Sequence, residues 1–299
     1  MRIGIDLGGT KIEAIALNGA GAGLFRGRRP TPTGDYAATV DAICGLVEEI
    51  EAQAGRQGTV GIGIPGTISR ASGLVKNANS TWLIGRALDA DLERRLRRPV
   101  RLANDADCFA LSEAVDGAAA GYPTVFGVIL GTGVGGGLVA DRRPLQGPNG
   151  IAGEWGHNPL PWPSDDERPG PPCYCGKHGC LETFLSGPGL AADHERRTGR
   201  RRTPQKIADG AARGDAEEVR TLELFEDRLA RGLGTVINVF DPAAIVLGGG
   251  LSNIERLYRT VPALLPRYVF SDRVDTVLLA PKHGDSSGVR GAAWLWPAE

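Results

Sequence analysis

The sequence lacks a long apolar run, and its few cysteines do not suggest disulfides. A membrane-spanning helix needs about 20 consecutive apolar residues, so we expect no membrane partner. The five cysteines are an odd number. A strand-like segment follows Met1 directly, without the charged and apolar stretches of a secretory signal. Together these features disfavour a disulfide framework and predict a protein of the reducing cytoplasm.

The sequence also lacks an excess of charge of either sign. Its 34 basic and 35 acidic side chains almost cancel. A nucleic acid or an anionic surface would be bound by surplus positive charge, so we expect no nucleic-acid partner. Hydrophobic residues make up 41% of the chain, which is ordinary for a globular protein. A length of 299 residues exceeds the usual size of one core and favours two domains.

Short apolar segments that alternate with helical patterns and glycine-rich turns predict an α/β protein. The expected strands are 2–6, 12–17, 24–28, 60–64, 100–103, 126–130 and 244–247. The expected helices are 35–50, 88–96, 108–118, 219–240 and 286–296. The strand and Gly/Thr turn at 3–10 return at 126–133, and the strand and turn at 60–66 also return, at 244–250. This repeat predicts two similar lobes.

Glycine-rich turns follow three of these predicted strands. A phosphate chain needs backbone N–H groups that approach closely, and glycine leaves that approach open. Threonine adds hydroxyl donors, Lys11 adds positive charge, and Asp6 could hold Mg²⁺ for phosphoryl transfer. Each turn alone fits an ordinary tight turn equally well, but their matching places favour an ATP site, and the spacing fits neither P-loop nor Rossmann turns. The candidate residues for ATP and Mg²⁺ are Asp6, Gly8, Gly9, Thr10, Lys11, Gly131, Thr132, Gly133, Gly248, Gly249 and Gly250.

Three cysteines lie close together in the sequence and offer the ligands of a structural zinc site. Cys173, Cys175 and Cys180 supply thiolates, and either His157 or His178 supplies an imidazole. Free thiols are the alternative, which the clustering of ligand types disfavours. Because four protein ligands leave no open position on zinc, we expect the metal to shape a neighbouring pocket and to perform no chemistry.

Six motifs resemble the ROK family of sugar kinases and sugar-responsive repressors, in matching order along the whole chain. They are DLGGTK, LANDAD, GTGVGGG, GEWGH, CYCGKHGCLE and VLGGG. The stretches VKNANSTWL, SEAVDGAAAG, GEWGHNPLPW and KHGDSSGVRGAAWLWP are similar to bacterial manno(fructo)kinases. The resemblance implies an actin-like ATPase (ribonuclease H-like) fold of two lobes, 1–118 and 119–285, with an inter-lobe cleft. It also implies that a C-terminal helix within 286–299 completes the first lobe, and that the protein is a homodimer.

The resemblance assigns roles to residues whose own sequence context is ambiguous. Asn104 and Asp105 after a strand more often mark a helix N-cap, but here Asp105 is implied to be the catalytic base. The commoner family pattern is LENDAN, from which this sequence departs at Ala103 and Asp107, and Asp107 places a second carboxylate nearby. The implied substrate-binding residues are Gly66, Asn79, Asn104, Asp105, Glu154, His157 and Glu182. The implied zinc ligands are His157, Cys173, Cys175 and Cys180, with the second ring nitrogen of His157 on a sugar hydroxyl.

The predicted activity is ATP-dependent phosphorylation of a free hexose. Resemblance alone favours D-fructose, converted to fructose 6-phosphate, with D-mannose as a secondary substrate. The motifs are shared with glucokinases and N-acetylhexosamine kinases, which are the alternatives within the family. A non-catalytic sugar-binding regulator is the alternative of another class. It is disfavoured because DLGGTK begins at Asp6, which leaves no room before it for a helix-turn-helix segment.

Overall fold

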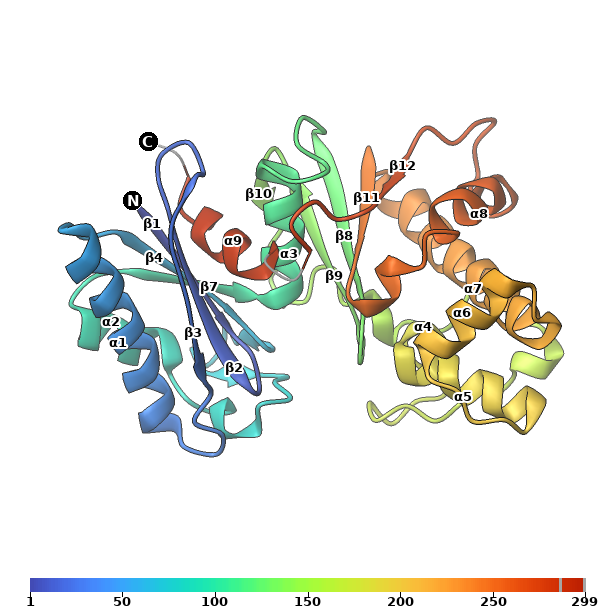
Figure 1. The fold of residues 1–299 in the computed structure, drawn as a ribbon, viewed down its shortest axis with the longest axis horizontal. Helices are drawn as coiled ribbons and strands as arrows, with labels where there is room; N and C mark the ends of the chain where they lie inside the picture. Colours follow the sequence, from blue (N-terminus) through green and yellow to red (C-terminus); the bar gives the residue numbers. More distant parts are fainter. Residues whose placement is uncertain (285–286, 298–299) are drawn as a thin grey trace. The chain divides into compact units, whose positions relative to one another are not determined.

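The computed structural model describes residues 1–284 and 287–297 as two compact α/β units, and Figure 1 shows the fold. The first unit comprises Met1–Gly121, Gly137–Ala152 and the C-terminal segment from Lys282. The second comprises Tyr122–Gly136 and Gly153–Pro281. The predicted two-lobed α/β architecture is therefore confirmed.

The first unit is built on a sheet with the strand order β3-β2-β1-β4-β7. Its strands are β1 (Arg2–Leu7), β2 (Lys11–Leu17), β3 (Gly23–Pro30), β4 (Thr59–Ile64) and β7 (Val100–Asn104). The first three strands form an antiparallel meander, and β4 and β7 continue the sheet parallel to β1. A small second hairpin pairs β5 (Thr67–Ile68) with β6 (Val75–Lys76). The three strands expected at 2–6, 12–17 and 24–28 are therefore confirmed.

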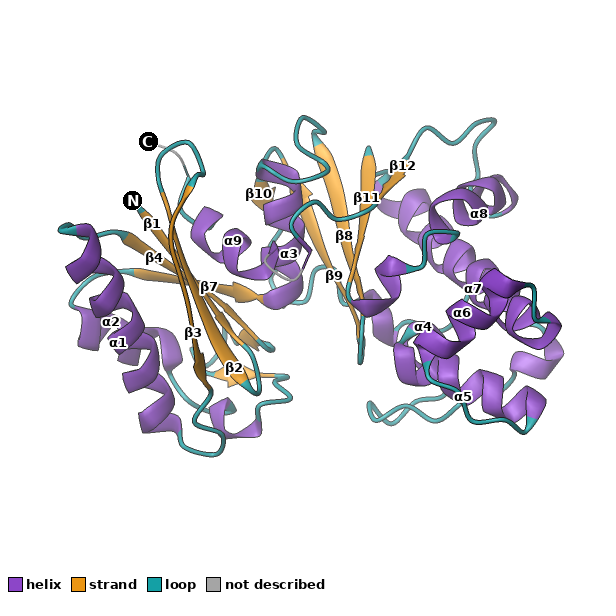
Figure 2. Ribbon diagram, in the orientation of Figure 1, coloured by secondary structure: helices purple, strands orange, loops and turns teal. Residues whose placement is uncertain are grey.

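Helices cover both faces of this sheet, as Figure 2 shows. On one side lie α1 (Tyr36–Ala54) and α2 (Leu88–Leu96), and on the other lie α3 (Asp105–Val115) and α9 (Ser287–Trp294). The alternation of side chains along β1 explains both contacts. Ile3 and Ile5 point into the core with α1, whereas Gly4 between them gives room to α9. A Cβ at Gly4 would lie 2.1 Å from the carbonyl oxygen of Val289.

Replacing Gly291 by alanine is expected to destabilise the protein by about 1–3 kcal/mol or more. Gly291 lies where α9 crosses α3, and a Cβ there would be 1.6 Å from the carbonyl oxygen of Cys108, so the helices would have to separate. Urea unfolding of the full chain measures the effect. The control is Gly19→Ala, because nothing lies within 4 Å of a Cβ at that exposed position. Equal losses in both variants would contradict the packing argument.

The second sheet has the order β10-β9-β8-β11-β12, which repeats the pattern of the first. Its strands are β8 (Thr124–Leu130), β9 (Val134–Ala140), β10 (Arg143–Pro144), β11 (Ala244–Gly248) and β12 (Val277–Leu279). In both sheets a three-strand segment leads to two further parallel strands, here β11 beside β8 and β12 beside β11. The repeat predicted from the glycine-rich turns is therefore present in the topology.

The helices of the second unit gather on one side of its sheet (Figure 2). They are α4 (Leu181–Leu185), α5 (Gly187–Thr198), α6 (Pro204–Arg213), α7 (Ala216–Phe240) and α8 (Leu257–Leu264). Leu222, Phe225, Leu229 and Leu233 of α7 are fully or almost fully buried, which confirms α7 as a central packing element. The short 3-10 helices are η1 (Thr81–Leu83), η2 (Trp155–His157), η3 (Asp165–Glu167), η4 (Gly250–Asn253) and η5 (Leu265–Arg267).

Some boundaries differ from those expected. The helix expected at 108–118 begins at Asp105 and ends at Val115, because Asn104 caps it. Residues 137–152, placed in the second lobe by the sequence division at 118, pack with the first unit. Gly137 lies against the first turn of α3, and the Lys76 ammonium donates to the carbonyl oxygen of Asn149. The last predicted helix is found at Ser287–Trp294; residue 286 and residues 298–299 of that prediction lie outside the described residues.

Among the described helices, none combines the length and apolar character needed to cross a bilayer.

Candidate active site and metal centre

The junction of β7 and α3 carries Asn104 and Asp105. The Asn104 side chain accepts a hydrogen bond from the Ala106 N–H at 2.9 Å, and its amide donates to the Gly66 carbonyl oxygen at 3.0 Å. Asn104 is therefore a helix cap that also holds the Gly66 loop. Asp105 is the first residue of α3, where its exposed carboxylate accepts from the same Ala106 N–H at 2.8 Å. The helix N-terminus favours a negative charge at this position.

The loop held by Asn104 requires glycine at position 66. Gly66 has a φ of +78°, and a Cβ there would lie 2.3 Å from the carbonyl oxygen of Lys76. The loop therefore packs closely against the segment that continues through Ala78 to Asn79, whose side chain is exposed. The predicted residues Gly66, Asn79, Asn104 and Asp105 all belong to this part of the first unit.

Asp6 lies near the end of β1, beside Gly288 at the start of α9. Burial, together with the negative charges of Asp105 and Glu13, raises the pKa of Asp6 to about 6. Because the charge of Asp105 raises the pKa of Asp6, the two carboxylates lie close enough to influence each other. A magnesium ion could replace the proton that this environment favours, since carboxylate oxygens are the ligands Mg²⁺ prefers.

The turn that follows β1 is fixed by a hydrogen bond within it and by two hydrogen bonds from Thr31, just beyond β3. The Gly8 N–H donates to the Lys11 carbonyl oxygen at 3.0 Å, and the Thr31 hydroxyl donates to the Gly8 carbonyl oxygen at 2.7 Å. The Thr31 N–H in turn donates to the carbonyl oxygen of Thr10. The Lys11 ammonium lies 3.7 Å from Glu13, so its charge is partly offset. The first predicted phosphate turn is therefore a constrained loop in the same unit as Asp105.

A small pocket of about 170 Å³ opens beside Asn104. Ala103 and Asp107, the two residues that depart from the commoner family pattern, line this pocket together with Gln146. Apolar side chains such as Ile68 and Leu102 form other parts of its wall. The pocket therefore combines polar and apolar surface within the first unit.

The second unit brings the other two glycine-rich turns together. Gly249 has a φ of +78°, and a Cβ there would lie 2.5 Å from the carbonyl oxygen of Leu130. The Gly187 N–H donates to the Gly131 carbonyl oxygen at 2.8 Å, which joins the start of α5 to the same turn. These turns border a pocket of about 820 Å³. Its lining residues include Gly131, Thr132, Gly187, Pro188, Ala191, Thr203, Lys206, Gly250 and Asn253.

Glu182 contacts the Gly131–Gly133 turn directly. Its carboxylate accepts a hydrogen bond from the Val134 N–H at 2.9 Å, and a Cβ at Gly133 would lie 2.7 Å from the same oxygen. Glu182 is in the first turn of α4, two residues after Cys180. A residue predicted to bind sugar is thus next to a turn predicted to bind phosphate.

Trp155 anchors the segment that carries Glu154 and His157. Its indole N–H donates to the Gly135 carbonyl oxygen at 3.0 Å, and its ring packs edge-on against Phe126. Trp155 is buried, whereas Glu154 is exposed and His157 is half-buried. The tryptophan is therefore a packing residue that fixes the two polar side chains on either side of it.

His157 and the three clustered cysteines converge at one point. Their ligand atoms all lie within 4.8 Å of one another. The His157 Nδ1 is 3.6 Å from the Cys173 sulfur, and the Cys175 sulfur is 3.6 Å from that of Cys180. Tetrahedral zinc bonds of about 2.0–2.3 Å separate their ligand atoms by roughly these distances. His178 is not in this group, which is the one detected among the described residues, so the geometry favours His157 as the histidine ligand.

The chemistry of the cluster also suits a soft metal ion. Burial raises the pKa of Cys180 to about 12, so this thiol ionises at neutral pH only where a cation replaces its proton. A hydrogen bond from the Lys177 backbone lowers the pKa of Cys175. Three sulfur ligands and one imidazole fit zinc. The second nitrogen of His157, Nε2, lies 2.9 Å from the Tyr174 hydroxyl, so a hydroxyl group can be bound there.

Sequence reasoning missed the contribution of α5 and α6 to the larger pocket. Both helices begin with a capping residue followed by proline in the first turn: Ser186 accepts from the Gly189 N–H, and Thr203 accepts from the Lys206 N–H. This pattern signals a helix start. It does not show which turn the helix will face, because that depends on contacts distant in sequence.

The ROK family profile matches residues 2–299. An N-acetyl-D-glucosamine kinase of Pectobacterium atrosepticum is 41% identical over 299 residues, covering 99% of this chain and 98% of the relative. The enzyme of the same name from Vibrio cholerae is also 41% identical, with 99% of each chain covered.

Two solved structures with high similarity are also ROK proteins. The ROK hexokinase from Thermus thermophilus has a TM-score of 0.87 and 31% identity, covering 98% of this chain and 97% of that one. A ROK glucokinase from Streptomyces griseus, solved with glucose and AMPPNP, has a TM-score of 0.77 and 29% identity, with the same coverage. The chain therefore belongs to the ROK family and has the two-lobed actin-like ATPase fold that its motifs predicted.

Proposed function

We propose that this ROK-family sugar kinase transfers the γ-phosphate of ATP to N-acetyl-D-glucosamine. The observation that carries the proposal is the 41% identity to N-acetyl-D-glucosamine kinases over nearly the full length of both chains. These relatives favour the N-acetylhexosamine alternative over the fructose and mannose substrates inferred from local motifs. The acceptor is proposed to be the primary 6-hydroxyl, which is the least hindered hydroxyl of the sugar.

The carboxylate of Asp105 is proposed to accept the proton of the attacking hydroxyl. Its exposed position at the start of α3 leaves it accessible to a substrate. Asn104, fixed by the Ala106 N–H and the Gly66 carbonyl, would orient the neighbouring sugar hydroxyls. Glu154, His157 and Glu182 of the second unit are proposed to bind the same sugar. Acceptor-rich side chains suit this role because sugar hydroxyls donate as well as accept.

The glycine turns are proposed to cradle the phosphates of ATP through their backbone N–H groups. The pocket of about 820 Å³ is large enough for a nucleoside, and Gly131, Thr132 and Gly250 lie at its border. Asp6 is proposed to hold Mg²⁺, which would neutralise charge on the transferring phosphoryl group. Zinc held by His157, Cys173, Cys175 and Cys180 would have no open coordination position, so its proposed role is to fix the sugar-binding residues around it.

A coupled ATP assay over a panel of sugars tests the substrate. We expect the highest kcat/KM for N-acetyl-D-glucosamine, with glucose, mannose, N-acetyl-D-mannosamine and fructose at least about tenfold lower, a difference worth 1.4 kcal/mol in the transition state. Fastest turnover of fructose would reinstate the substrate favoured by the sequence motifs. No turnover of any sugar, with sugar binding retained, would favour the regulator alternative.

Lowering the pH through about 6 is expected to weaken Mg²⁺ binding at Asp6, so that the reaction needs more Mg²⁺. The raised pKa of about 6 means that the carboxyl gains a proton as pH falls below this value. Since Mg²⁺ binds the ionised form, its affinity should fall up to tenfold per pH unit below pH 6. Initial rates against Mg²⁺ concentration at pH 5.5 and 7.5 measure this effect.

The γ-phosphate of ATP also gains a proton in this pH range, so the control is Asp6→Asn. That variant should need more Mg²⁺ at pH 7.5 and should show only the pH dependence that belongs to ATP. An unchanged pH dependence in Asp6→Asn, combined with normal Mg²⁺ affinity, would remove Asp6 from the proposed magnesium site.

The protein is also proposed to form a homodimer. Two large apolar side chains of the second unit, Val239 and Phe270, are 84% and 99% exposed. Such residues are commonly covered at protein interfaces. Light scattering after size exclusion should give about twice 31.4 kDa, and a mass of 31.4 kDa at micromolar concentration would contradict this proposal.

A further inference from the structure

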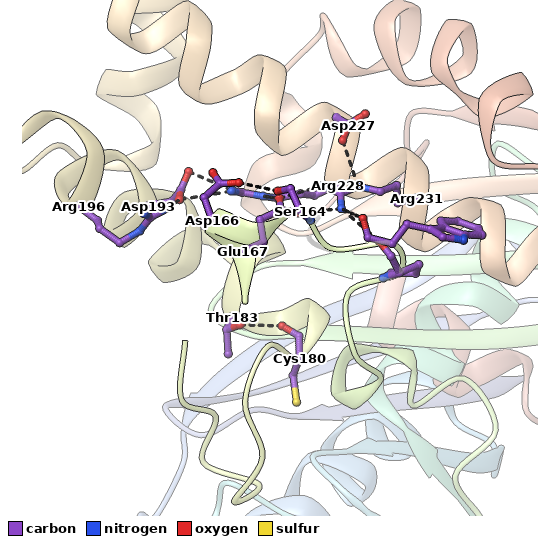
Figure 3. A network of polar contacts seen from close by, with 12 residues as sticks. Ser164, Asp166, Glu167, Cys180, Thr183, Asp193, Arg196, Asp227, Arg228 and Arg231 are labelled. Atoms are coloured by element: carbon purple, nitrogen blue, oxygen red, sulfur yellow. Dashed lines mark hydrogen bonds and ion pairs between the residues drawn. The ribbon is translucent and has the colours of Figure 1, made fainter. Parts of the chain in front are cut away.

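A buried group of charged side chains joins α7 to the chain between His157 and Cys173 (Figure 3). Glu167, Arg228 and Arg231 are each at most 5% exposed. The Glu167 carboxylate accepts from Arg228 at 2.7 Å and from two nitrogens of Arg231 at 2.8 Å each. This carboxylate therefore binds two arginines one helical turn apart on α7.

Two further carboxylates and a third arginine complete the group, because Arg196 lies 2.6 Å from Asp193, and three arginines then face three carboxylates. Arg228 also lies 2.9 Å from Asp193 of α5, and the Nε of Arg231 lies 3.0 Å from Asp227. Desolvation offsets much of the attraction within such a buried group, so its net contribution to stability is small compared with apolar packing. Its directional hydrogen bonds nevertheless allow few alternative arrangements.

Arg231 holds the backbone of the loop 158–172 as well as its carboxylate. One guanidinium nitrogen donates to the carbonyl oxygens of Pro161 at 3.1 Å and Trp162 at 2.9 Å. The Ser164 N–H donates to Glu167 at 3.0 Å, which ties the loop to the same carboxylate from within. Arg228 bonds the carboxylates of Glu167 and Asp193, whereas Arg231 also binds these two loop carbonyls, so Arg231 is the arginine that fixes the path of this loop.

The loop connects the ligands of the metal cluster. It leaves His157 at one end and reaches Cys173 at the other. Near the cluster, the Leu160 N–H donates to the Gly179 carbonyl oxygen and the Gly179 N–H donates to that of Pro171, both at 2.9 Å. The middle of the loop is held by Arg231, and its two ends are held against the segment that carries Cys180.

The next residue on α7 supports both sugar-binding segments. A Cβ at Gly232 would lie 2.9 Å from the ring of Trp155 and 3.1 Å from the side chain of Leu181. Trp155 lies between Glu154 and His157, and Leu181 immediately precedes Glu182. One turn of α7 therefore contacts the loop through Arg231 and the flanking segments through Gly232.

We infer that Arg231, acting through Glu167 and the loop carbonyls, is a positioning residue for the metal-binding and sugar-binding side chains. It sets the separation of His157 from the cysteines, and through the Cys180 segment it sets the position of Glu182. The part of this inference that concerns sugar rests on the proposed function. The part that concerns the metal cluster does not.

The test is Arg231→Lys, which keeps the positive charge but loses the planar fork that reaches Glu167 and two carbonyls together. We expect zinc affinity, measured by competition with a chromophoric chelator, to fall by about 10–100-fold. The KM for N-acetyl-D-glucosamine should rise about tenfold or more, while the KM for ATP changes less than twofold. A group that served stability alone would lower Tm without this split.

The matched control is Arg256→Lys, which alters another α7 ion pair, between Arg256 and Glu226 at 2.5 Å. It should leave zinc affinity and both KM values unchanged. Where Arg231→Lys does not fold, Glu167→Gln replaces it, because the amide preserves shape while losing the charge that holds both arginines. Wild-type zinc affinity in the folded variants would overturn the inference. A wild-type protein that does not phosphorylate N-acetyl-D-glucosamine would overturn the proposed function instead, and the chelator measurement would still test Arg231.

Discussion

Replacing Asp105 by asparagine is expected to lower kcat for sugar phosphorylation by about 10²–10⁴-fold, because the amide cannot accept the proton of the attacking hydroxyl. The fold should be retained, since an asparagine oxygen can still accept the hydrogen bond that the Ala106 N–H now donates to Asp105 at 2.8 Å. The KM values for sugar and ATP should change far less than kcat. Steady-state kinetics with purified protein, alongside circular dichroism, measure these quantities.

Asp107 provides the matched control, because it is a second carboxylate in the same first turn of α3. It lines the pocket of about 170 Å³ beside Asn104. Asp107→Asn should lower kcat by less than about tenfold, a loss typical of a residue that only tunes its surroundings. The reverse order, with Asp107→Asn inactive and Asp105→Asn active, would show that the base had been assigned to the wrong carboxylate.

Local sequence patterns were sufficient to predict the frame of the fold. The repeated Gly/Thr turn predicts two similar lobes. In the structure the two sheets repeat one pattern of strand order, β3-β2-β1-β4-β7 and β10-β9-β8-β11-β12. The apolar periodicity of 219–240 corresponds to α7, whose buried face includes Leu222, Phe225 and Leu229. Such patterns can be recognised in the sequence because a strand or helix must place its own apolar residues on one face.

Contacts between distant segments could not be predicted in the same way. Residues 137–152 join the first unit through contacts such as Lys76 with Asn149, which no local pattern indicates. Arginines on a helix are mostly exposed, yet Arg228 and Arg231 are buried and form ion pairs with Glu167 and Asp193. Ion pairs across 35 to 64 positions depend on how the loops close, and their burial follows from that closure.

The site residues were predictable to different degrees. The cysteine cluster could be predicted because three thiols so near each other in a sequence are typical of metal sites. The structure brings these cysteines together with His157. The identity of the sugar substrate could not be predicted from these residues. Phosphate turns and polyol-binding carboxylates serve any hexose, so they do not distinguish one sugar from another. Resemblance in short stretches favours fructose, whereas similarity over the whole chain favours N-acetyl-D-glucosamine.

Replacing Cys180 by serine is expected to abolish stable zinc binding and to raise the KM for sugar at least about tenfold. Cys180 is buried, and its thiol has a pKa of about 12 in the absence of a cation. Zinc binding must therefore supply the free energy to ionise it, and a serine hydroxyl is far harder to ionise. We expect affinity for zinc to fall by at least about 100-fold, which is more than loss of an outer hydrogen bond causes. Metal analysis of purified protein and chelator competition measure the change.

Cys44→Ala is the matched control, because Cys44 is a fully buried cysteine in α1 and outside the cluster. It should lower stability through the lost packing but keep one zinc ion per chain and a normal KM for sugar. The distinction matters because Glu182 follows Cys180 by two residues and bonds the Val134 N–H of the neighbouring turn. Loss of zinc should therefore loosen Glu182 and affect sugar binding more than ATP binding. If Cys180→Ser retained zinc, or lost it with no change in the KM for sugar, the metal would not be what holds the sugar-binding residues in place.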